Sequence, residues 1–132
     1  MSTILVVDDN PLNLKLTCIT LELAGHETLT ATNGREAIAI VLATKLDLIL
    51  MDLRMPVLDG KLAMEAIKAN VHLRHIPIVV LTASAMKGER EHLLQCGFDG
   101  YIDKPIDVTK FADTVAKFLK EVDPSQYKNP PE

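Results

Sequence analysis

The sequence of 132 residues has few cysteines, no run of basic residues and no long apolar stretch. Each of these absences excludes some classes of protein. Cys18 and Cys96 are its only cysteines, and neither belongs to a CxxC motif or to the Cys/His spacing of a metal site. We therefore interpret both as buried or partly buried thiols in a reducing compartment, rather than as a disulfide or metal ligands.

The charge balance and the apolar runs argue against a nucleic-acid-binding, membrane-bound or secreted protein. Fourteen Lys and Arg residues against 18 Asp and Glu residues give a net charge of −4, so we expect proteins as partners rather than nucleic acid or a membrane. No apolar stretch reaches the roughly 18 residues of a membrane span, and the first residues lack the basic start of a signal peptide. We therefore expect a cytoplasmic protein.

The length predicts a single domain with one core. Hydrophobic residues make up 48 % of the chain, so we expect it to fold without disulfides or structural metals. After about residue 123 the composition becomes polar and proline-rich. We therefore expect a domain over residues 1–122 and a mobile polar tail over residues 123–132.

Short apolar runs mark the expected strands, at residues 4–7, 48–51, 78–81 and, more weakly, 100–102. Continuous apolar runs are typical of strands covered on both faces, as in a parallel sheet between helical layers. A more alternating strand fits residues 27–31, and helical patterns lie between the strands. The alternation of strands and helices predicts an α/β fold with a doubly wound parallel sheet of five strands and five helices.

The helices are predicted from periodicity and from capping residues. Asn10 with Pro11, and Asn33 with Glu36, are typical helix starts, whereas Gly25 and Gly97 are placed where helices end. Further helices are expected over residues 61–70 and 88–96. Two apolar stripes at helical spacing are interpreted as core faces: Leu12, Leu16, Ile19 and Leu23, and later Val108, Phe111, Val115, Leu119 and Val122.

Polar side chains follow the ends of four expected strands. Asp8 and Asp9 follow the first apolar run, Asp52 the second and Thr82 the third, while the last run leads through Asp103 to Lys104. Parallel strands end at one edge of their sheet, and ligands bind outside that edge. If the first, third, fourth and fifth strands are neighbours, these side chains lie within reach of one small ligand.

Three carboxylates placed together repel one another, which a divalent cation relieves. Oxygen ligands suit Mg²⁺, with Mn²⁺ as an alternative. A carboxylate beside such an ion can attack a phosphoryl group and form an acyl phosphate, while the ion and a lysine neutralise the phosphoryl oxygens.

Each of these residues also has a structural explanation. Asp8 or Asp9 could cap the first helix, although Asn10 and Pro11 already fill that role and leave the two carboxylates without a structural duty. Asp52 could begin a turn, and Thr82 is an ordinary strand residue. Lys104 alone would be a solvated surface charge. The four histidines, His26, His72, His75 and His92, are scattered, and we interpret them as surface or core residues.

Four motifs at these positions give the sequence a specific resemblance. They are ILVVDDN at 4–10, LMDLRMP at 50–56 followed by DG at 59–60, LTA at 81–83, and YIDKP at 101–105. The sequence resembles the response-regulator receiver family of two-component signalling over about residues 3–122. Within it, ASAMKGE at 83–89 is similar to stand-alone DivK/CheY-like regulators, in particular those of the DivK type, and to the receivers of hybrid kinases.

The resemblance implies a flavodoxin-like sheet of order 2-1-3-4-5 and a role for each site residue. Asp52 would accept the phosphoryl group. Mg²⁺ would be held by Asp9 directly, by Asp8 through water or through another ligand, by Asp52, and by the backbone carbonyl of Arg54. Lys104 would contact the phosphoryl group, and Thr82 and Tyr101 would move when it binds. A Tyr near a strand end is, without the resemblance, more often a packing residue.

The resemblance also implies a function and partners. The protein would be a phosphorylation-activated switch whose only chemistry is its own phosphorylation and slow dephosphorylation, not an enzyme. Its phosphoryl donor would be a sensor or hybrid histidine kinase or a histidine phosphotransfer protein. A downstream protein would read the surface of the fourth helix, fifth strand and fifth helix. We expect a monomer or a weak dimer.

Three alternatives remain at this point. A metal-dependent phosphohydrolase with an aspartyl nucleophile needs a second carboxylate two residues later, where this sequence has Arg54. A flavodoxin-like cofactor binder needs a phosphate loop after the first strand, where Asp8 and Asp9 would repel a phosphate. The third alternative is a receiver-like docking module that is never phosphorylated. It is disfavoured because the sequence has all the residues that phosphorylation needs: Asp8, Asp9, Asp52, Thr82 and Lys104.

Overall fold

The computed structural model describes residues 2–52, 60–82, 87–103 and 107–121, which form five strands and five helices in strict alternation. The strands are β1 (Thr3–Val7), β2 (Glu27–Ala31), β3 (Leu48–Asp52), β4 (Ile78–Thr82) and β5 (Gly100–Asp103). The helices are α1 (Pro11–Leu23), α2 (Gly34–Ala43), α3 (Gly60–Ala69), α4 (Lys87–Cys96) and α5 (Val108–Glu121). The expected elements are confirmed, with boundaries that differ by no more than a residue or two.

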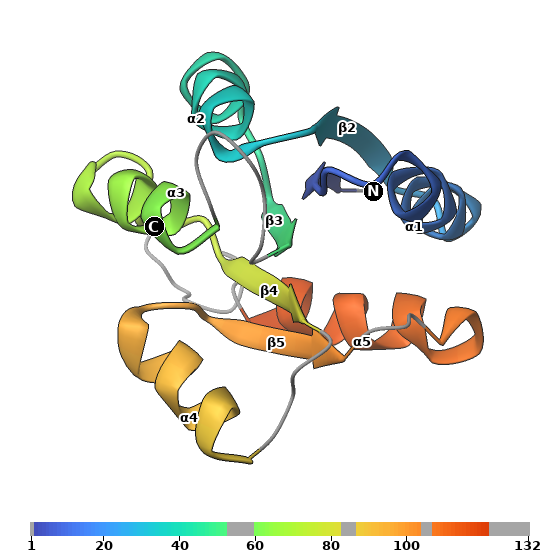
Figure 1. Ribbon diagram of the computed structural model, residues 1–132. Coiled ribbons are helices and arrows are strands. Elements are labelled where there is room, and N and C mark those ends of the chain that lie inside the picture. Colours follow the sequence, from blue (N-terminus) through green and yellow to red (C-terminus); the bar gives the residue numbers. More distant parts are fainter. Residues whose placement is uncertain (1, 53–59, 83–86, 104–106, 122–132) are drawn as a thin grey trace.

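The five strands form one parallel sheet in the order β2-β1-β3-β4-β5, as expected. Helices α1 and α5 lie on one side of the sheet, and α2, α3 and α4 lie on the other (Figure 1). The strand order reverses direction between β1 and β3, and this is where an open parallel sheet binds its ligands. Within the part of the chain that the structure describes, no helix combines the length and apolarity needed to cross a membrane.

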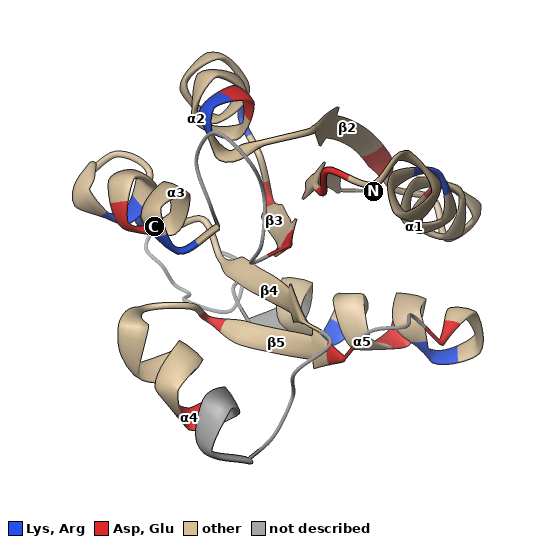
Figure 2. Ribbon diagram, viewed as in Figure 1, with Lys and Arg blue, Asp and Glu red and all other residues tan. Residues whose placement is uncertain are grey.

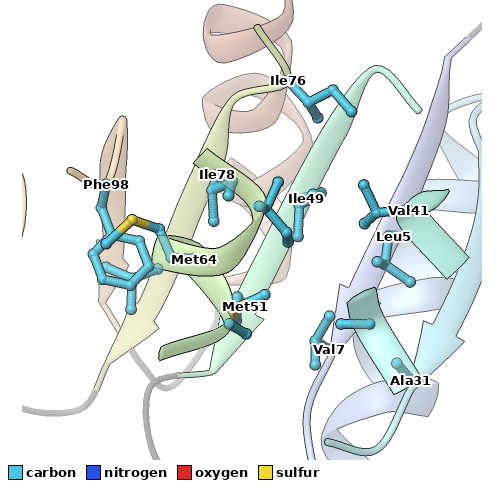
Figure 3. Packing of buried hydrophobic residues seen from close by; sticks show 14 of the residues in the cluster. Leu5, Val7, Ala31, Val41, Ile49, Met51, Met64, Ile76, Ile78 and Phe98 are labelled. Atoms are coloured by element: carbon cyan, nitrogen blue, oxygen red, sulfur yellow. The ribbon is translucent and has the colours of Figure 1, made fainter. Parts of the chain in front are cut away.

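Alternate residues of the buried strands supply two cores, one on each face of the sheet. Leu5, Val7, Ile49 and Met51 belong to the core under α2, α3 and α4, which Figure 3 shows from close by. The residues between them, such as Val6 and Leu50, belong to the core under α1 and α5. Because both faces are covered, the strands carry continuous apolar runs, as the sequence indicated. Cys18 is a buried free thiol and Cys96 is partly buried.

The predicted helix caps are confirmed, with one difference of detail. The Asn10 side chain accepts hydrogen bonds from the backbone N–H groups of Leu12 and Asn13, and Pro11 occupies the first turn of α1. Asn33 caps α2 by accepting from the N–H of Glu36. Glu36, however, accepts from the backbone and hydroxyl of Thr32, one residue before the cap, and these bonds lower its pKa.

The two glycines predicted at helix ends have the backbone conformation that such ends require. Gly25 follows α1 with φ of 96° and Gly97 follows α4 with φ of 126°. Residues with a side chain rarely adopt these angles, so glycine permits the chain to leave the helix and enter the next strand.

The interpretation of the α1 stripe as a core face is wrong. Leu12, Leu16, Ile19 and Leu23 are exposed, and the core face of α1 consists of Leu14, Thr17, Cys18 and Leu21. Apolar residues occupy both faces of this helix at the same spacing, so periodicity could not decide between them.

The α5 stripe is partly confirmed. Phe111 and Val115 are buried and Leu119 is half-buried, but Val108 is 49 % exposed at the start of the helix. Val122 and the predicted tail, 123–132, lie outside the described residues.

An ion pair at the amino edge of the sheet joins α3 to two strands. The Nζ of Lys68 donates to Oδ2 of Asp99 at 2.7 Å and to the backbone carbonyls of Arg74 and Ile76 at 3.2 and 3.1 Å. The same Asp99 oxygen accepts the backbone N–H of Ile78, at the start of β4, at 2.8 Å. Asp99 immediately precedes β5, so one carboxylate fixes the start of both strands relative to α3.

We expect Asp99→Ala to lower the free energy of unfolding by about 2–3 kcal/mol, because it leaves the N–H of Ile78 without its acceptor and a partly buried ammonium without its counter-charge. Lys68→Met retains the bond to Ile78 and should cost less, about 1 kcal/mol. Urea unfolding measures both, with Lys61→Met on the same helix as the control. An Asp99→Ala protein within about 0.5 kcal/mol of wild type would contradict this role.

Candidate functional site: an acidic cluster at the carboxyl edge of the sheet

The first part of the site is the Asp8–Asp9 pair that follows β1. Asp8 is 1 % exposed, and its backbone N–H donates to the carbonyl of Ala31 at 3.1 Å. Its carboxylate accepts the backbone N–H of Asn10 at 2.9 Å, which helps to set the turn into α1. The expectation that Asp8 has no structural duty is therefore wrong. Asp9 is exposed at the mouth of the site.

Asp52 provides the third carboxylate from the neighbouring strand. It is the last residue of β3 and is half-buried, and Met51 before it pairs with Val7 of β1. The parallel register therefore places Asp8 and Asp52 side by side, one residue beyond this pair. One carboxylate oxygen from each of Asp8, Asp9 and Asp52 lies within 4.8 Å of the others. Figure 2 shows this acidic grouping at the ends of β1 and β3.

Three carboxylates so close together form a donor set for a hard divalent cation. Mg²⁺ prefers oxygen ligands, and one or two protein carboxylates commonly hold it while other positions stay open for water or phosphate. Its charge would offset the mutual repulsion of the three anions. The residues present therefore fit the magnesium site that the sequence predicted. No histidine or cysteine joins the cluster among the described residues.

Thr82 and Tyr101 lie on the next two strands. Thr82 ends β4 and is 5 % exposed, one position beyond Leu81, which pairs with Asp52. Tyr101 of β5 pairs with Val80 and packs, half-buried, against the core under α2, α3 and α4. The structure thus places Thr82 at the same edge as the acidic cluster, with Tyr101 behind it on the neighbouring strand.

Two predicted site residues, Arg54 and Lys104, lie outside the described residues. Their assignments therefore remain predictions. Arg54 follows β3 by two residues and Lys104 follows β5 directly, so both belong to connections that leave the carboxyl edge of the sheet.

The fold and the acidic edge define a class of protein. Residues 4–116 match the family model of the response regulator receiver domain, and the chain belongs to that family. The DivK-type resemblance agrees with its curated relatives. The polar-differentiation response regulator DivK of Brucella anthropi is 40 % identical over 117 residues, covering 89 % of this chain and 95 % of that protein.

Solved structures agree with this assignment. The receiver domain of the sensor histidine kinase PA1611 from Pseudomonas aeruginosa, with a magnesium ion coordinated in its active-site cleft, is 34 % identical. Its TM-score is 0.82, with coverage of 90 % of this chain and 98 % of that one. The chemotaxis response regulator CheY4 of Vibrio cholerae is 29 % identical with a TM-score of 0.84, and the match covers 89 % of this chain and 98 % of that one. The protein is therefore a receiver domain of two-component signalling, a family whose members are typically signalling switches and not classical enzymes.

Proposed function

We propose that this protein is a Mg²⁺-dependent switch that accepts a phosphoryl group on Asp52 from a histidine kinase or a histidine phosphotransfer protein. The observation that carries the proposal is the acidic cluster, in which Asp52 lies with two other carboxylates at the carboxyl edge of the sheet. An isolated aspartate at the end of a strand would have an ordinary structural explanation, but three carboxylates with oxygens within 4.8 Å of one another also repel, and a bound cation offsets that repulsion.

In this proposal Asp8, Asp9 and Asp52 would hold the metal together with the backbone carbonyl of Arg54. Mg²⁺, when bound, neutralises the oxygens of the transferred phosphoryl group. Support comes from the donor chemistry of the cluster and from the magnesium ion in the PA1611 receiver. Asp8 is fixed by its hydrogen bond to Asn10, whereas the exposed Asp9 can adjust to the ion.

Asp52 is the nucleophile in the proposed reaction. A carboxylate oxygen of Asp52 forms a bond to phosphorus as the bond from phosphorus to the donor breaks, and the product is an acyl phosphate. Lys104 supplies a positive charge to the phosphoryl oxygens. Later attack by water releases phosphate and restores the carboxylate, so the cycle is slow self-dephosphorylation and not turnover of a separate substrate.

Thr82 and Tyr101 are the proposed switch residues. Thr82 would turn its hydroxyl toward the phosphoryl group, and Tyr101 would then move inward and alter the surface of α4, β5 and α5. Their places on adjacent strands support this coupling. A downstream protein would read that surface. We further propose that the switch occupies residues 1–122, followed by a polar tail over residues 123–132, and that it acts in the cytoplasm.

The test is an NMR titration of the full chain with Mg²⁺ and then with beryllofluoride, a mimic of the phosphoryl group. We expect Mg²⁺ alone to shift the amide signal of Asp52, and the amide signals of Thr82 and Tyr101 to shift when beryllofluoride is added in its presence. His26, which precedes β2 at the opposite edge of the sheet, is the internal control. A chain whose site signals do not respond would instead be a receiver-like docking module.

A further inference from the structure

Asn10 lies between the acidic cluster and helix α1 and makes hydrogen bonds to both. Its backbone N–H donates to Oδ1 of Asp8 at 2.9 Å, so it holds one oxygen of that buried carboxylate. Its side-chain Oδ1 accepts the N–H groups of Leu12 and Asn13 at 2.9 and 3.2 Å, and its backbone carbonyl accepts the N–H of Leu14 at 3.0 Å. One exposed residue therefore connects a proposed metal ligand to the first turn of a helix.

The side-chain bonds of Asn10 help to fix the direction of the N–H that it donates to Asp8. Asn10 has φ of −95° and ψ of 114°, the extended backbone that a capping residue adopts. Loss of a cap frays the first turn of a helix, and here it would release the backbone of Asn10 as well. A carboxylate that is already oriented loses less conformational freedom when it binds an ion. The cap of α1 therefore favours metal binding at the acidic cluster.

Helix α2 has the same kind of cap at a distance from the acidic cluster. Asn33 has an extended backbone and accepts the N–H of Glu36 at 2.9 Å. It follows β2, the edge strand of the sheet, which contributes none of the three clustered carboxylates. Removal of either cap frays one helix, but only the cap of α1 is bonded to Asp8. Asn33 therefore provides a matched control for Asn10.

We propose that Asn10 is a positioning residue that couples the capping of α1 to Mg²⁺ binding at the acidic cluster. The inference rests on the proposed function, because it takes the cluster to be a magnesium site. Coupling is reciprocal: the factor by which the intact cap raises the affinity for Mg²⁺ is also the factor by which bound Mg²⁺ favours the intact cap. We expect this factor to be about fivefold, at the lower end of coupling between sites, because Asn10 acts through Asp8.

Removal of the cap should weaken metal binding. Asn10→Ala keeps the backbone N–H that bonds Asp8 and removes the side-chain acceptor, so the dissociation constant for Mg²⁺ should rise about fivefold. Asn10→Ser, whose hydroxyl can cap the helix, should bind with nearly wild-type affinity. Asn33→Ala should lower the melting temperature, as Asn10→Ala does, and leave the affinity unchanged. NMR titration of the full chain with Mg²⁺, followed at the amide signal of Asp52, gives each dissociation constant.

The reciprocal effect needs no substitution. Saturating Mg²⁺ should slow the exchange of the Leu12 and Asn13 amide protons with water about fivefold, because these N–H groups are released to water when the cap opens. The amide proton of Glu36, capped by Asn33 on α2, should exchange at the same rate with and without Mg²⁺. NMR measurements of amide exchange on wild type give these rates.

The results separate this inference from the proposed function. If wild type binds Mg²⁺ and Asn10→Ala binds it equally well, or if Mg²⁺ leaves the exchange of Leu12 and Asn13 unchanged, the coupling is wrong and the proposed function stands. Equal weakening by Asn10→Ala and Asn33→Ala would show an effect of general stability and would also overturn the coupling. If the Asp52 signal of wild type does not respond to Mg²⁺, the proposed magnesium site is wrong and this inference fails with it.

Discussion

Replacing Asp52 with Asn is expected to abolish phosphorylation of the protein. Wild type incubated with acetyl phosphate and Mg²⁺ should gain the mass of one phosphoryl group, and removal of the metal with EDTA should prevent this. Asparagine has nearly the shape of aspartate, so Asp52→Asn should leave the end of β3 folded while removing the nucleophilic oxygen. Asp9→Asn should retain the acceptor but slow labelling about 100-fold, because it removes a proposed metal ligand.

Intact-protein mass spectrometry measures the labelling, and peptide mapping identifies the modified residue. Asp113→Asn, at an exposed position on α5, is the matched control and should be labelled at the wild-type rate. Full labelling of Asp52→Asn would show that the acceptor is elsewhere, although the fold would stand. Absence of labelling in wild type, together with no NMR response to beryllofluoride, would favour the docking module.

Repulsion within the acidic cluster should lower the stability of the protein when no metal is bound. We expect Asp8→Asn and Asp52→Asn each to raise the melting temperature in EDTA, because each removes like-charge repulsion from the acidic cluster. Two carboxylate oxygens 4.8 Å apart repel by about 1 kcal/mol in water and by about 3 kcal/mol at an effective dielectric constant near 20. A gain of about 1–2 kcal/mol raises the melting temperature of a domain this size by about 3–8 °C.

Magnesium should reverse the order of the melting temperatures, so that wild type melts above both variants. Wild type gains stability as Mg²⁺ occupies the cluster, whereas either variant has lost a ligand and should gain less. The amide oxygen that Asp8→Asn introduces can still accept the N–H of Asn10, so this variant preserves the local turn. Differential scanning calorimetry with EDTA and with Mg²⁺ gives both values for each protein. A fall of several degrees in EDTA for both variants would contradict the repulsion between these carboxylates.

Most of the fold could be predicted from local patterns. The runs at residues 4–7 and 48–51 have no polar alternation, which is typical of a parallel sheet covered on both faces, and both strands are buried. Asn10 and Gly25 mark the limits of α1 because capping depends on residues adjacent in the sequence. The Lys68–Asp99 pair was not predicted, because its two residues are 31 positions apart and no motif connects them.

The candidate site was predicted from the rule that parallel strands end at one edge. That rule selected Asp8, Asp9, Asp52 and Thr82, but it could not show that their strands are neighbours. The register of β1 against β3 places Asp8 beside Asp52, and β4 places Thr82 next to them. The hydrogen bond from Asn10 to Asp8 also required coordinates, because either aspartate could have capped the helix.

By itself, then, the sequence determined the order of strands and helices, the helix caps and the set of residues at the carboxyl edge, because these depend on neighbours along the chain. The tertiary structure decided which apolar face of α1 is buried. Leu14, Cys18 and Leu21 repeat with the same helical period as the exposed α1 stripe, and only the path of the chain from β1 onto the sheet distinguishes the two faces. Periodicity places apolar residues on a common face, but burial depends on which other elements pack against that face.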